Sequence, residues 1–313
     1  MPKTTEIKNK LILGENLDIL KTIKNEGIDL IYIDPPFFSN RNYEVIFGDE
    51  AEIRSFEDRW EGGVNVYVEW MKERVTELYR VLKPTGSFYL HCDWHASHHL
   101  RVMLDEVFGA KHFQNEIIWA YRTGGATQKR WSRKHDNIYF YTKTDNYTFN
   151  PQKEKSYMGV DYNTGNKNVV LYDDKDGLGK YTLVNAKDWW EIGMMATSSK
   201  ERLGYPTQKP EALLEKIIKA SSNKGNIVLD SFCGCGTSLA VAQKLNRHWV
   251  GIDISPTAIK LVERRLNTLG ARKDTYITIN TPTTEEDLKA FKPFEFQNWV
   301  IDELQAKHSR TTG

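Results

Sequence analysis

Short apolar runs alternate with amphipathic helical patterns along most of the chain, and this alternation restricts the fold more than any other feature. Residues 29–33 are almost entirely apolar, as expected of a strand that is covered on both faces. Apolar side chains then recur at helical spacing from 64 to 82, and a strand at 86–91 and a helix at 95–108 follow. The alternation predicts an α/β fold with a doubly wound, mostly parallel sheet.

The rhythm stops between residues 144 and 187, where the chain is polar and rich in Asn, Asp, Lys, Tyr and Gly. A connection of this length inside a compact domain is usually either functional or disordered. Regular patterns return with a helix at 210–221, strands at 226–230 and 248–253, and a helix that Ser255 caps. After residue 272 we expect two short amphipathic helices, at 284–290 and 296–306, and no further strand.

Composition excludes several classes of protein. Hydrophobic residues make up 40% of the 313 residues, which is enough for a sizeable core. No run approaches the roughly 20 apolar residues that cross a membrane, and the first residues lack the apolar run of a signal peptide. Three cysteines are too few and odd in number for a disulfide framework. We therefore expect a cytoplasmic protein with reduced thiols and no membrane segment.

The formal net charge of +1 conceals a local asymmetry. Residues 111–134 are basic with Glu116 as their one acidic residue, whereas residues 44–61 are acidic. A basic stretch of this kind suits a surface that faces phosphates, and a solvated loop is the alternative. The candidate DNA-contacting residues are Arg122, Lys129, Arg130, Arg133 and Lys134.

A glycine-rich turn follows the strand predicted at 226–230 and opens a helix at Thr237. Gly234 and Gly236 let the backbone turn sharply and approach a ligand closely, and the helix start offers free N–H groups. Asp253 lies 17 residues beyond Gly236, a spacing that suits a carboxylate accepting hydrogen bonds from two ribose hydroxyls. No third glycine follows, so a nucleoside with a small zwitterionic tail fits better than a pyrophosphate. A bare glycine turn is the alternative.

The sequence Asp34-Pro35-Pro36-Phe37 directly follows the apolar strand at 29–33. Two prolines fix the backbone at the carboxyl end of a strand, where open α/β sheets bind ligands. Asp34 and the Pro35 carbonyl supply two acceptors, and Phe37 supplies a flat apolar face. Two acceptors can hold both N–H groups of an exocyclic amine and turn its lone pair toward an incoming methyl group. A simple proline turn is the alternative.

These two motifs, in this order, resemble the β class of amino DNA methyltransferases, in which D-P-P-[YF] precedes F-x-G-x-G. Further matching blocks are LILGEN at 11–16, KPTGSFYLHCD at 83–93, HDNIYFYTK at 135–143 and YPTQKP at 205–210. The resemblance implies the Rossmann-like fold of S-adenosylmethionine-dependent methyltransferases, S-adenosylmethionine as cofactor and double-stranded DNA as partner. Because a base inside a duplex cannot reach such a pocket, it also implies base flipping.

The resemblance also implies roles for particular residues. Asp34, Pro35, Pro36 and Phe37 would hold the flipped base. The cofactor would be held by Phe232, Gly234, Gly236, Thr237 and Asp253, with Asp230, Thr207, Lys209 and Asp93 near its methionine end. We accordingly divide the chain into a catalytic half (1–143), a target-recognition insert (144–200), a cofactor-binding half (201–272) and a C-terminal helical extension (273–313).

The motif letters favour one product over another. Aspartate at the first position resembles the adenine N6 enzymes, whereas serine is commoner there in cytosine N4 enzymes. We therefore expect a site-specific DNA adenine N6 methyltransferase that belongs to a restriction-modification system. Cytosine N4 methylation, an RNA methyltransferase and a non-catalytic DNA-binding module are the alternatives. Protein-glutamine enzymes usually carry N-P-P-Y after the cofactor block, which is the reverse order.

Two cysteines and several histidines invite a metal interpretation. His95 and His99 lie one helical turn apart, but a catalytic zinc site needs three protein ligands and no third one is evident. Cys233 and Cys235 have no second cysteine pair to complete a zinc site. We therefore predict no metal.

The sequence PFEFQNWVI at 293–301 resembles the opening helix of Mrr-type restriction-endonuclease domains. The acidic and lysine residues of such a nuclease would come later in the sequence than Gly313, so we predict no cleavage activity. The hypothesis is a methyltransferase whose nuclease partner is truncated or encoded separately, and an amphipathic surface helix is the alternative. A cognate restriction endonuclease and a homodimer both remain open as partners.

Overall fold

The computed structural model describes residues 9–39, 42–44, 55–57, 62–122, 127–157, 170–175, 177, 179–195, 199, 201–203, 207–272, 274–282, 284–289 and 300. The strands are β1 (Asn9–Leu13), β2 (Ile28–Ile33), β3 (Asn42–Glu44), β4 (Ser55–Glu57), β5 (Leu82–Cys92), β6 (Phe113–Ala120), β7 (His135–Thr142), β8 (Lys153–Tyr157), β9 (Tyr172–Asp173), β10 (Lys180–Asn185), β11 (Trp189–Glu191), β12 (Ile227–Asp230), β13 (His248–Asp253) and β14 (Tyr276–Ile279). The helices are α1 (Asn16–Thr22), α2 (Val64–Val81), α3 (Ser97–Phe108), the 3-10 turn η1 (Ala110–His112), α4 (Glu211–Ser221), α5 (Thr237–Lys244), α6 (Pro256–Thr268) and α7 (Glu285–Lys289).

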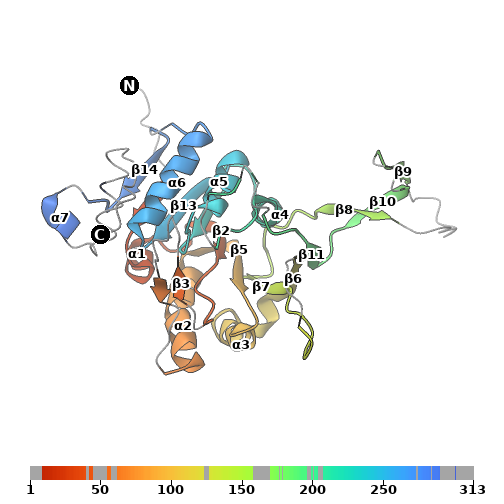
Figure 1. Cartoon of the computed structure of the whole chain (residues 1–313), viewed down its shortest axis with the longest axis horizontal. Helices are drawn as coiled ribbons and strands as arrows, with labels where there is room; N and C mark the ends of the chain where they lie inside the picture. The colour runs from red at the N-terminus through yellow and green to blue at the C-terminus, as the bar shows by residue number, and fades with distance from the viewer. Residues whose placement is uncertain are drawn as a thin grey trace.

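The main sheet has the strand order β11-β6-β7-β5-β2-β12-β13-β1-β14. β7 runs antiparallel to its neighbours β5 and β6, whereas the other neighbouring pairs of this sheet are parallel. The predicted α/β fold with a doubly wound, mostly parallel sheet is confirmed. Figure 1 shows this sheet at the centre of the molecule, with helices packed against it.

Helices cover both faces of the sheet, as the apolar strand at 29–33 predicted. Within β2, Ile31 and Ile33 pack into one core with residues of α1, α2 and α3. Leu30 and Tyr32 point the other way, into a second core with residues of α4, α5 and α6. Because successive side chains of a strand point to opposite faces, a strand between two cores must be apolar at almost every position.

The topology places a ligand crevice between β2 and β12. These strands are parallel neighbours, but the chain leads from β2 toward β5 on one side and from β12 toward β13 on the other. Ligands of open α/β sheets bind at the carboxyl ends of the strands where the order reverses in this way. The Asp34–Phe37 segment follows β2, the glycine turn follows β12, and Asp253 ends β13. The fold therefore brings both sequence motifs to one place.

The predicted helix caps and boundaries are largely confirmed. The Ser255 side chain accepts a hydrogen bond from the Ala258 N–H, and Pro256 occupies the first turn of α6. α3 begins at Ser97 instead of at residue 95, and β5 begins at Leu82, directly after α2. β5 is therefore longer at both ends than the strand predicted at 86–91.

Two regions differ from the sequence-based prediction. The tail after residue 272, expected to contain no strand, forms β14, which pairs in parallel with β1 at the edge of the main sheet. The insert forms a separate antiparallel sheet of β8, β10 and β9, which projects away from the body (Figure 1), and then returns through β11 to pair with β6. α7 lies within the helix expected at 284–290, whereas the 296–306 helix and the Mrr-like segment lie outside the described residues apart from residue 300. Among the described helices, none has the length and apolar character that a membrane crossing needs.

Candidate active site

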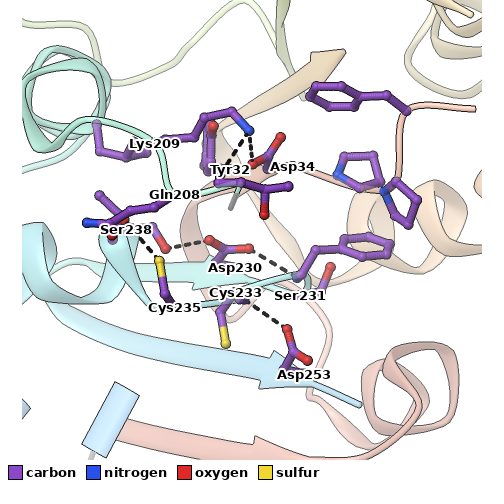
Figure 2. A pocket seen from close by; sticks show the side chains of 18 of the residues that line it. Tyr32, Asp34, Gln208, Lys209, Asp230, Ser231, Cys233, Cys235, Ser238 and Asp253 are labelled. Carbon is purple, nitrogen blue, oxygen red and sulfur yellow. Dashed lines mark hydrogen bonds and ion pairs between the residues drawn. The ribbon is translucent and has the colours of Figure 1, made fainter. Parts of the chain in front are cut away.

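A cavity of about 590 Å³ lies at the carboxyl ends of β2, β12 and β13. The volume is within the usual range for small-molecule sites. Figure 2 shows Asp230 between Asp34 on one side and Asp253 on the other. The predicted site residues that line the cavity are Asp34, Pro35, Pro36, Phe37, Asp93, Thr207, Lys209, Asp230, Phe232, Gly234, Thr237 and Asp253. Gly236 shapes the turn behind this wall.

Asp34 directly follows β2, and its two carboxylate oxygens have different surroundings. The Lys209 ammonium donates to Oδ2 at 2.5 Å, and the two side chains are 17% and 11% exposed. Oδ1 is buried and receives no hydrogen bond from the described residues. A buried acceptor without a donor is costly unless a ligand supplies one. This oxygen is therefore available to an N–H donor of a ligand in the cavity. The Lys209 ammonium also lies 5.0 Å from the centre of the Phe37 ring.

The two prolines are held by α2 and by an unusual backbone turn. The Tyr67 hydroxyl donates to the Pro36 carbonyl at 2.6 Å. Phe38 turns the chain at a φ of 58°, which is uncommon for a residue with a side chain, and its ring packs against Tyr67 at 5.6 Å. Backbone strain of this kind persists only where neighbouring contacts fix it, and it is frequent at ligand sites.

The glycine turn after β12 has the close packing that its sequence predicts. Gly236 adopts a left-handed conformation with a φ of 71° and caps the start of α5. A Cβ atom there would lie 2.7 Å from Val262 Cγ2 of α6. Both the backbone angle and the lack of space therefore require glycine.

Two carboxylates frame this turn, and each accepts hydrogen bonds from the backbone. Asp253 accepts from the Gly234 N–H at 2.8 Å and from the Ser255 N–H at 2.9 Å. Asp230 accepts from the Phe232 N–H at 3.0 Å and from the Ser238 hydroxyl. Desolvation raises the pKa of Asp253 to about 6 and that of Asp230 to about 7.

Residues at the start of α1 lie against the beginning of the glycine turn, and they were not assigned from the sequence. The Asn16 amide donates to the Ser231 carbonyl at 3.0 Å, and Arg74 of α2 holds both Asn16 and Glu15. The Ser231 hydroxyl is buried and has no partner among the described residues. Glu15 and Asn16 belong to the LILGEN block, so their position in a matching block was the available signal.

The predicted DNA-contacting residues lie outside the cavity, on the loop that joins β6 to β7. Both ends of this loop are fixed at the cavity, because Tyr121 and Asp136 line it and the Tyr121 N–H donates to the Lys134 carbonyl at 3.0 Å. Arg122, Lys129, Arg130 and Arg133 are exposed and Lys134 is partly exposed, and Arg133 lies over the ring of Trp94, the residue after Asp93 of the cavity wall. Trp131 in the same loop is 94% exposed.

The histidine run after β5 separates into residues with different surroundings. His91 is fully buried, His95 pairs with Asp93 through a 2.6 Å contact, and His98 and His99 are exposed on α3. In the described part of the chain, no three His, Cys, Asp or Glu side chains come together as a metal site. Cys233 and Cys235 are buried free thiols.

Comparison with known proteins assigns the chain to a family. The sequence profile of the N6/N4 DNA methylases matches residues 28–264. The chain belongs to this DNA methylase family. It is 33% identical to the type II methyltransferase M.HpaI of Haemophilus parainfluenzae over 263 residues, which are 82% of this chain and 74% of that protein. It is 31% identical to the DNA adenine methyltransferase YhdJ of Escherichia coli K12, over 82% of each chain.

The fold is that of S-adenosylmethionine-dependent methyltransferases. The crystal structure of the M1.HpyAVI complex with S-adenosylmethionine superimposes with a TM-score of 0.53 at 19% identity, over 82% of this chain and 98% of that one. The cofactor of this DNA methyltransferase is S-adenosylmethionine, and DNA is its substrate.

The residues of the cavity fit this cofactor. The turn at Gly236 leaves no space for a side chain, and the start of α5 directs backbone N–H groups toward the cavity. Asp253 keeps acceptor capacity beyond its two backbone bonds, because each carboxylate oxygen has two lone pairs. The Ser231 hydroxyl, which has no partner in the part of the chain that the structure describes, supplies a further polar group to the same wall.

Proposed function

We propose that this methyltransferase transfers a methyl group to N6 of adenine in duplex DNA after the base is flipped into the cavity. Asp34 Oδ1 carries this proposal, because it is a buried acceptor at the cavity with no donor among the described residues. Asp34, the Pro35 carbonyl and Phe37 together offer two acceptors and an aromatic face. These are the groups that an exocyclic amine on a flat ring requires.

In the proposed reaction the protein positions the amine, and little base strength is needed. One N–H of the amine donates to Asp34 Oδ1 and the other to the Pro35 carbonyl, so the nitrogen lone pair turns out of the plane of the ring. Lys209 holds Oδ2 and thereby fixes the orientation of the carboxylate. S-adenosylmethionine supplies an electrophilic methyl group when it is bound. The growing positive charge on nitrogen is then stabilised by Asp34.

Two observations favour adenine over cytosine. Asp34 occupies the position at which the resemblance associates aspartate with adenine N6 enzymes. The similar protein YhdJ is a DNA adenine methyltransferase. Cytosine N4 is the second candidate, since its amine would satisfy the same two acceptors.

We assign DNA contacts to the β6–β7 loop and to the insert. Lys129, Arg130 and Arg133 of this loop are exposed cations, and exposed cations can neutralise phosphates. The sheet of β8, β9 and β10 projects from the body (Figure 1), as expected of an element that contacts the duplex beside the flipped base. We infer that this projecting sheet reads the sequence, and that the enzyme works in a restriction-modification system, as the type II name of M.HpaI indicates for that protein.

Mapping modified bases in DNA tests this proposal. The protein is expressed in a host whose DNA lacks the modification, and the nucleosides are quantified by mass spectrometry and located by single-molecule sequencing. N6-methyladenine in one sequence context is expected, and the Asp34→Ala variant serves as the inactive control. N4-methylcytosine would favour the second candidate. Unmodified DNA, together with intact S-adenosylmethionine binding by calorimetry, would contradict both.

A further inference from the structure

His91 is a fully buried histidine near the end of β5, and both nitrogens of its ring have partners. The Tyr32 hydroxyl lies 2.8 Å from Nδ1, and Asp136 Oδ2 lies 3.2 Å from Nε2. Tyr121 donates to the other oxygen of Asp136 at 3.0 Å. Tyr32, Tyr121 and Asp136 line the cavity, so a chain of polar groups runs beneath its floor from β2 through β5 to β7.

This chain of groups reaches the oxygen of Asp34 that has no donor. His91 Nδ1 is 3.8 Å from Asp34 Oδ1. The Phe37 ring, which would cover the flipped base, lies 5.5 Å from the imidazole, and Trp119 packs edge-on against the imidazole at the same distance. The ring is thus fixed on two sides, and a shift of less than about 1 Å would bring Nδ1 within hydrogen-bond distance of Asp34.

The neighbours of His91 determine which nitrogen holds a proton. Burial, with the charges of Asp34 and other carboxylates, raises the pKa of Tyr32 well above its usual value, so Tyr32 keeps its proton and can donate to Nδ1. Burial alone would raise the pKa of Asp136, but the hydrogen bond from His91 and the other favourable interactions lower it. The carboxylate of Asp136 therefore holds the Nε2 proton, and the Nδ1 lone pair faces Tyr32 and Asp34.

The proposed methyl transfer creates a proton that must leave this part of the cavity. When nitrogen forms its bond to the methyl carbon it becomes positively charged, and it returns to neutrality by breaking one N–H bond and keeping the electron pair. Of the two groups that accept from the amine, Asp34 Oδ1 takes the proton, because a carboxylate is far more basic than the Pro35 carbonyl. Lys209 already occupies Oδ2, and the pocket floor is aromatic. A second acceptor adjacent to Oδ1 would therefore carry the proton away from the methylated nucleobase.

Resting on the proposed function, we propose that His91 is a positioning residue that acts through Asp34 and accepts this proton at Nδ1. The proton moves from the amine nitrogen to Asp34 Oδ1 and then to Nδ1, while the Tyr32 hydroxyl turns from donor to acceptor. The resulting imidazolium lies between the carboxylates of Asp34 and Asp136, which compensate its charge. Asp34 is restored for the next turnover, and the proton leaves to water with the product.

The experiment compares the single-turnover methyl-transfer rate across pH in the full-length wild type and in variants. The ionisable groups around His91 are Tyr32 and Asp34 of the β2 end, Asp136 of β7, Cys92 at the end of β5 and Asp93 after it, Tyr121 of the β6 end, and Lys209 beyond Asp34. His91→Asn keeps a polar group near Tyr32, and His91→Gln keeps one near Asp136, but neither accepts a proton. His112→Asn is the matched control, because His112 lies on η1, bonds the Phe108 carbonyl and faces Asp145.

The pH dependence of the single-turnover rate should differ between the wild type and the His91 variants, because the variants have no proton acceptor beside Asp34. His91→Asn and His91→Gln should also lose roughly 100-fold in rate, with unchanged S-adenosylmethionine affinity and DNA KM. His112→Asn should behave as wild type. A wild-type pH profile in both His91 variants would overturn the proposal, as would a loss that is equal at every pH and accompanied by lower thermal stability.

A second readout does not depend on turnover. Nitrogen NMR of the imidazole in the cofactor-free protein should show a His91 ring that has its proton on Nε2, and Asp34→Asn should shift the His91 nitrogen signals. No effect of Asp34→Asn on the His91 signals would overturn the coupling between the two residues. A wild type that methylates no DNA would instead contradict the proposed function, and the NMR result would still decide whether Asp34 and His91 interact.

Discussion

The two halves of the cavity hold their carboxylates in different ways. In the cofactor half, Asp230 and Asp253 accept hydrogen bonds from backbone N–H groups of the turns beside them. In the base half, Asp34 is held by the side chain of Lys209, 175 residues away in the sequence, and one of its oxygens has no donor among the described residues. The carboxylates of the cofactor half are thus held by the turns beside them, whereas Asp34 in the base half keeps one oxygen for the substrate.

This contrast predicts the largest effect for Asp34→Ala. The variant removes the acceptor that orients the amine and stabilises its developing charge, so methyl transfer should fall by at least roughly 1,000-fold. Cofactor affinity should change little, because the glycine turn and Asp253 are untouched. Radiolabel transfer to duplex DNA and calorimetry with S-adenosylmethionine measure the two quantities. A strong loss of cofactor binding would show that Asp34 belongs to the cofactor half, and the division would be wrong.

Gly236→Ala changes the backbone of the cofactor half and should weaken cofactor binding. Gly236→Ala places a methyl group 2.7 Å from Val262 Cγ2 and forces a side chain into a left-handed conformation. The backbone angle alone costs about 1–2 kcal/mol, and we expect cofactor affinity to fall by about tenfold or more. Urea unfolding and calorimetry measure both effects.

The double variant Gly236→Ala with Val262→Ala separates the two causes. It relieves the collision but leaves the backbone angle, so the two substitutions should be less damaging together than the sum of their single effects. Additive losses would mean that the collision with Val262 contributes nothing. Wild-type cofactor affinity in Gly236→Ala would contradict the role of the turn.

The same contrast explains which parts of the site are visible in the sequence. The glycine turn, Asp253 and the Asp34–Phe37 segment lie at strand ends, turns and helix starts. Residues that are close in the sequence determine these local structures, so a single sequence reveals them. The ion pair of Asp34 with Lys209 depends on contacts across the whole fold. The contact of His91 with Asp136 depends on the antiparallel register of β5 and β7, in which His91 lies opposite Ile138. A single sequence does not specify that register.

The sheet shows the same limit. Strands that are buried on both faces, such as β2, can be predicted from their continuous apolar runs. β11 and β14 lie at the two edges and have three and four residues with mixed burial. Trp189–Glu191 is too short to show a strand pattern, whereas the aromatic and β-branched run Tyr276–Ile279, between Asp274 and Asn280, is a strand signal that the sequence analysis missed. Their pairing with β6 and β1 comes from the completed sheet. The insert is visible in the sequence as a break in the rhythm, but its β8, β9 and β10 pairing is not.

Asp230→Asn should have the smallest effect on the rate of methyl transfer. The variant tests whether Asp230 serves only to hold the turn through its hydrogen bonds. An asparagine can accept from the Phe232 N–H and donate to the Ser238 hydroxyl, so both hydrogen bonds survive. The transfer rate at saturating cofactor should therefore stay within about fivefold of wild type. A loss as large as that of Asp34→Ala would show that Asp230 acts directly on the reacting groups.

Stability should reveal the charge of Asp230 where activity does not. Its pKa is about 7 in the folded protein and roughly 3.9 in an unfolded chain, so the folded state keeps the proton that the unfolded state releases. Below about pH 4 the group is neutral in both states. As pH rises from about 4 to 7, this group lowers the free energy of unfolding, because ionisation then favours the unfolded chain.

In Asp230→Asn that decline of the free energy of unfolding should shrink by an amount on the order of 1–3 kcal/mol. Part of it should persist, since Asp253 titrates in the same direction with a pKa of about 6. Urea unfolding of both proteins at several pH values measures the difference, and parallel stability curves would mean that Asp230 is ionised equally in the folded and unfolded states.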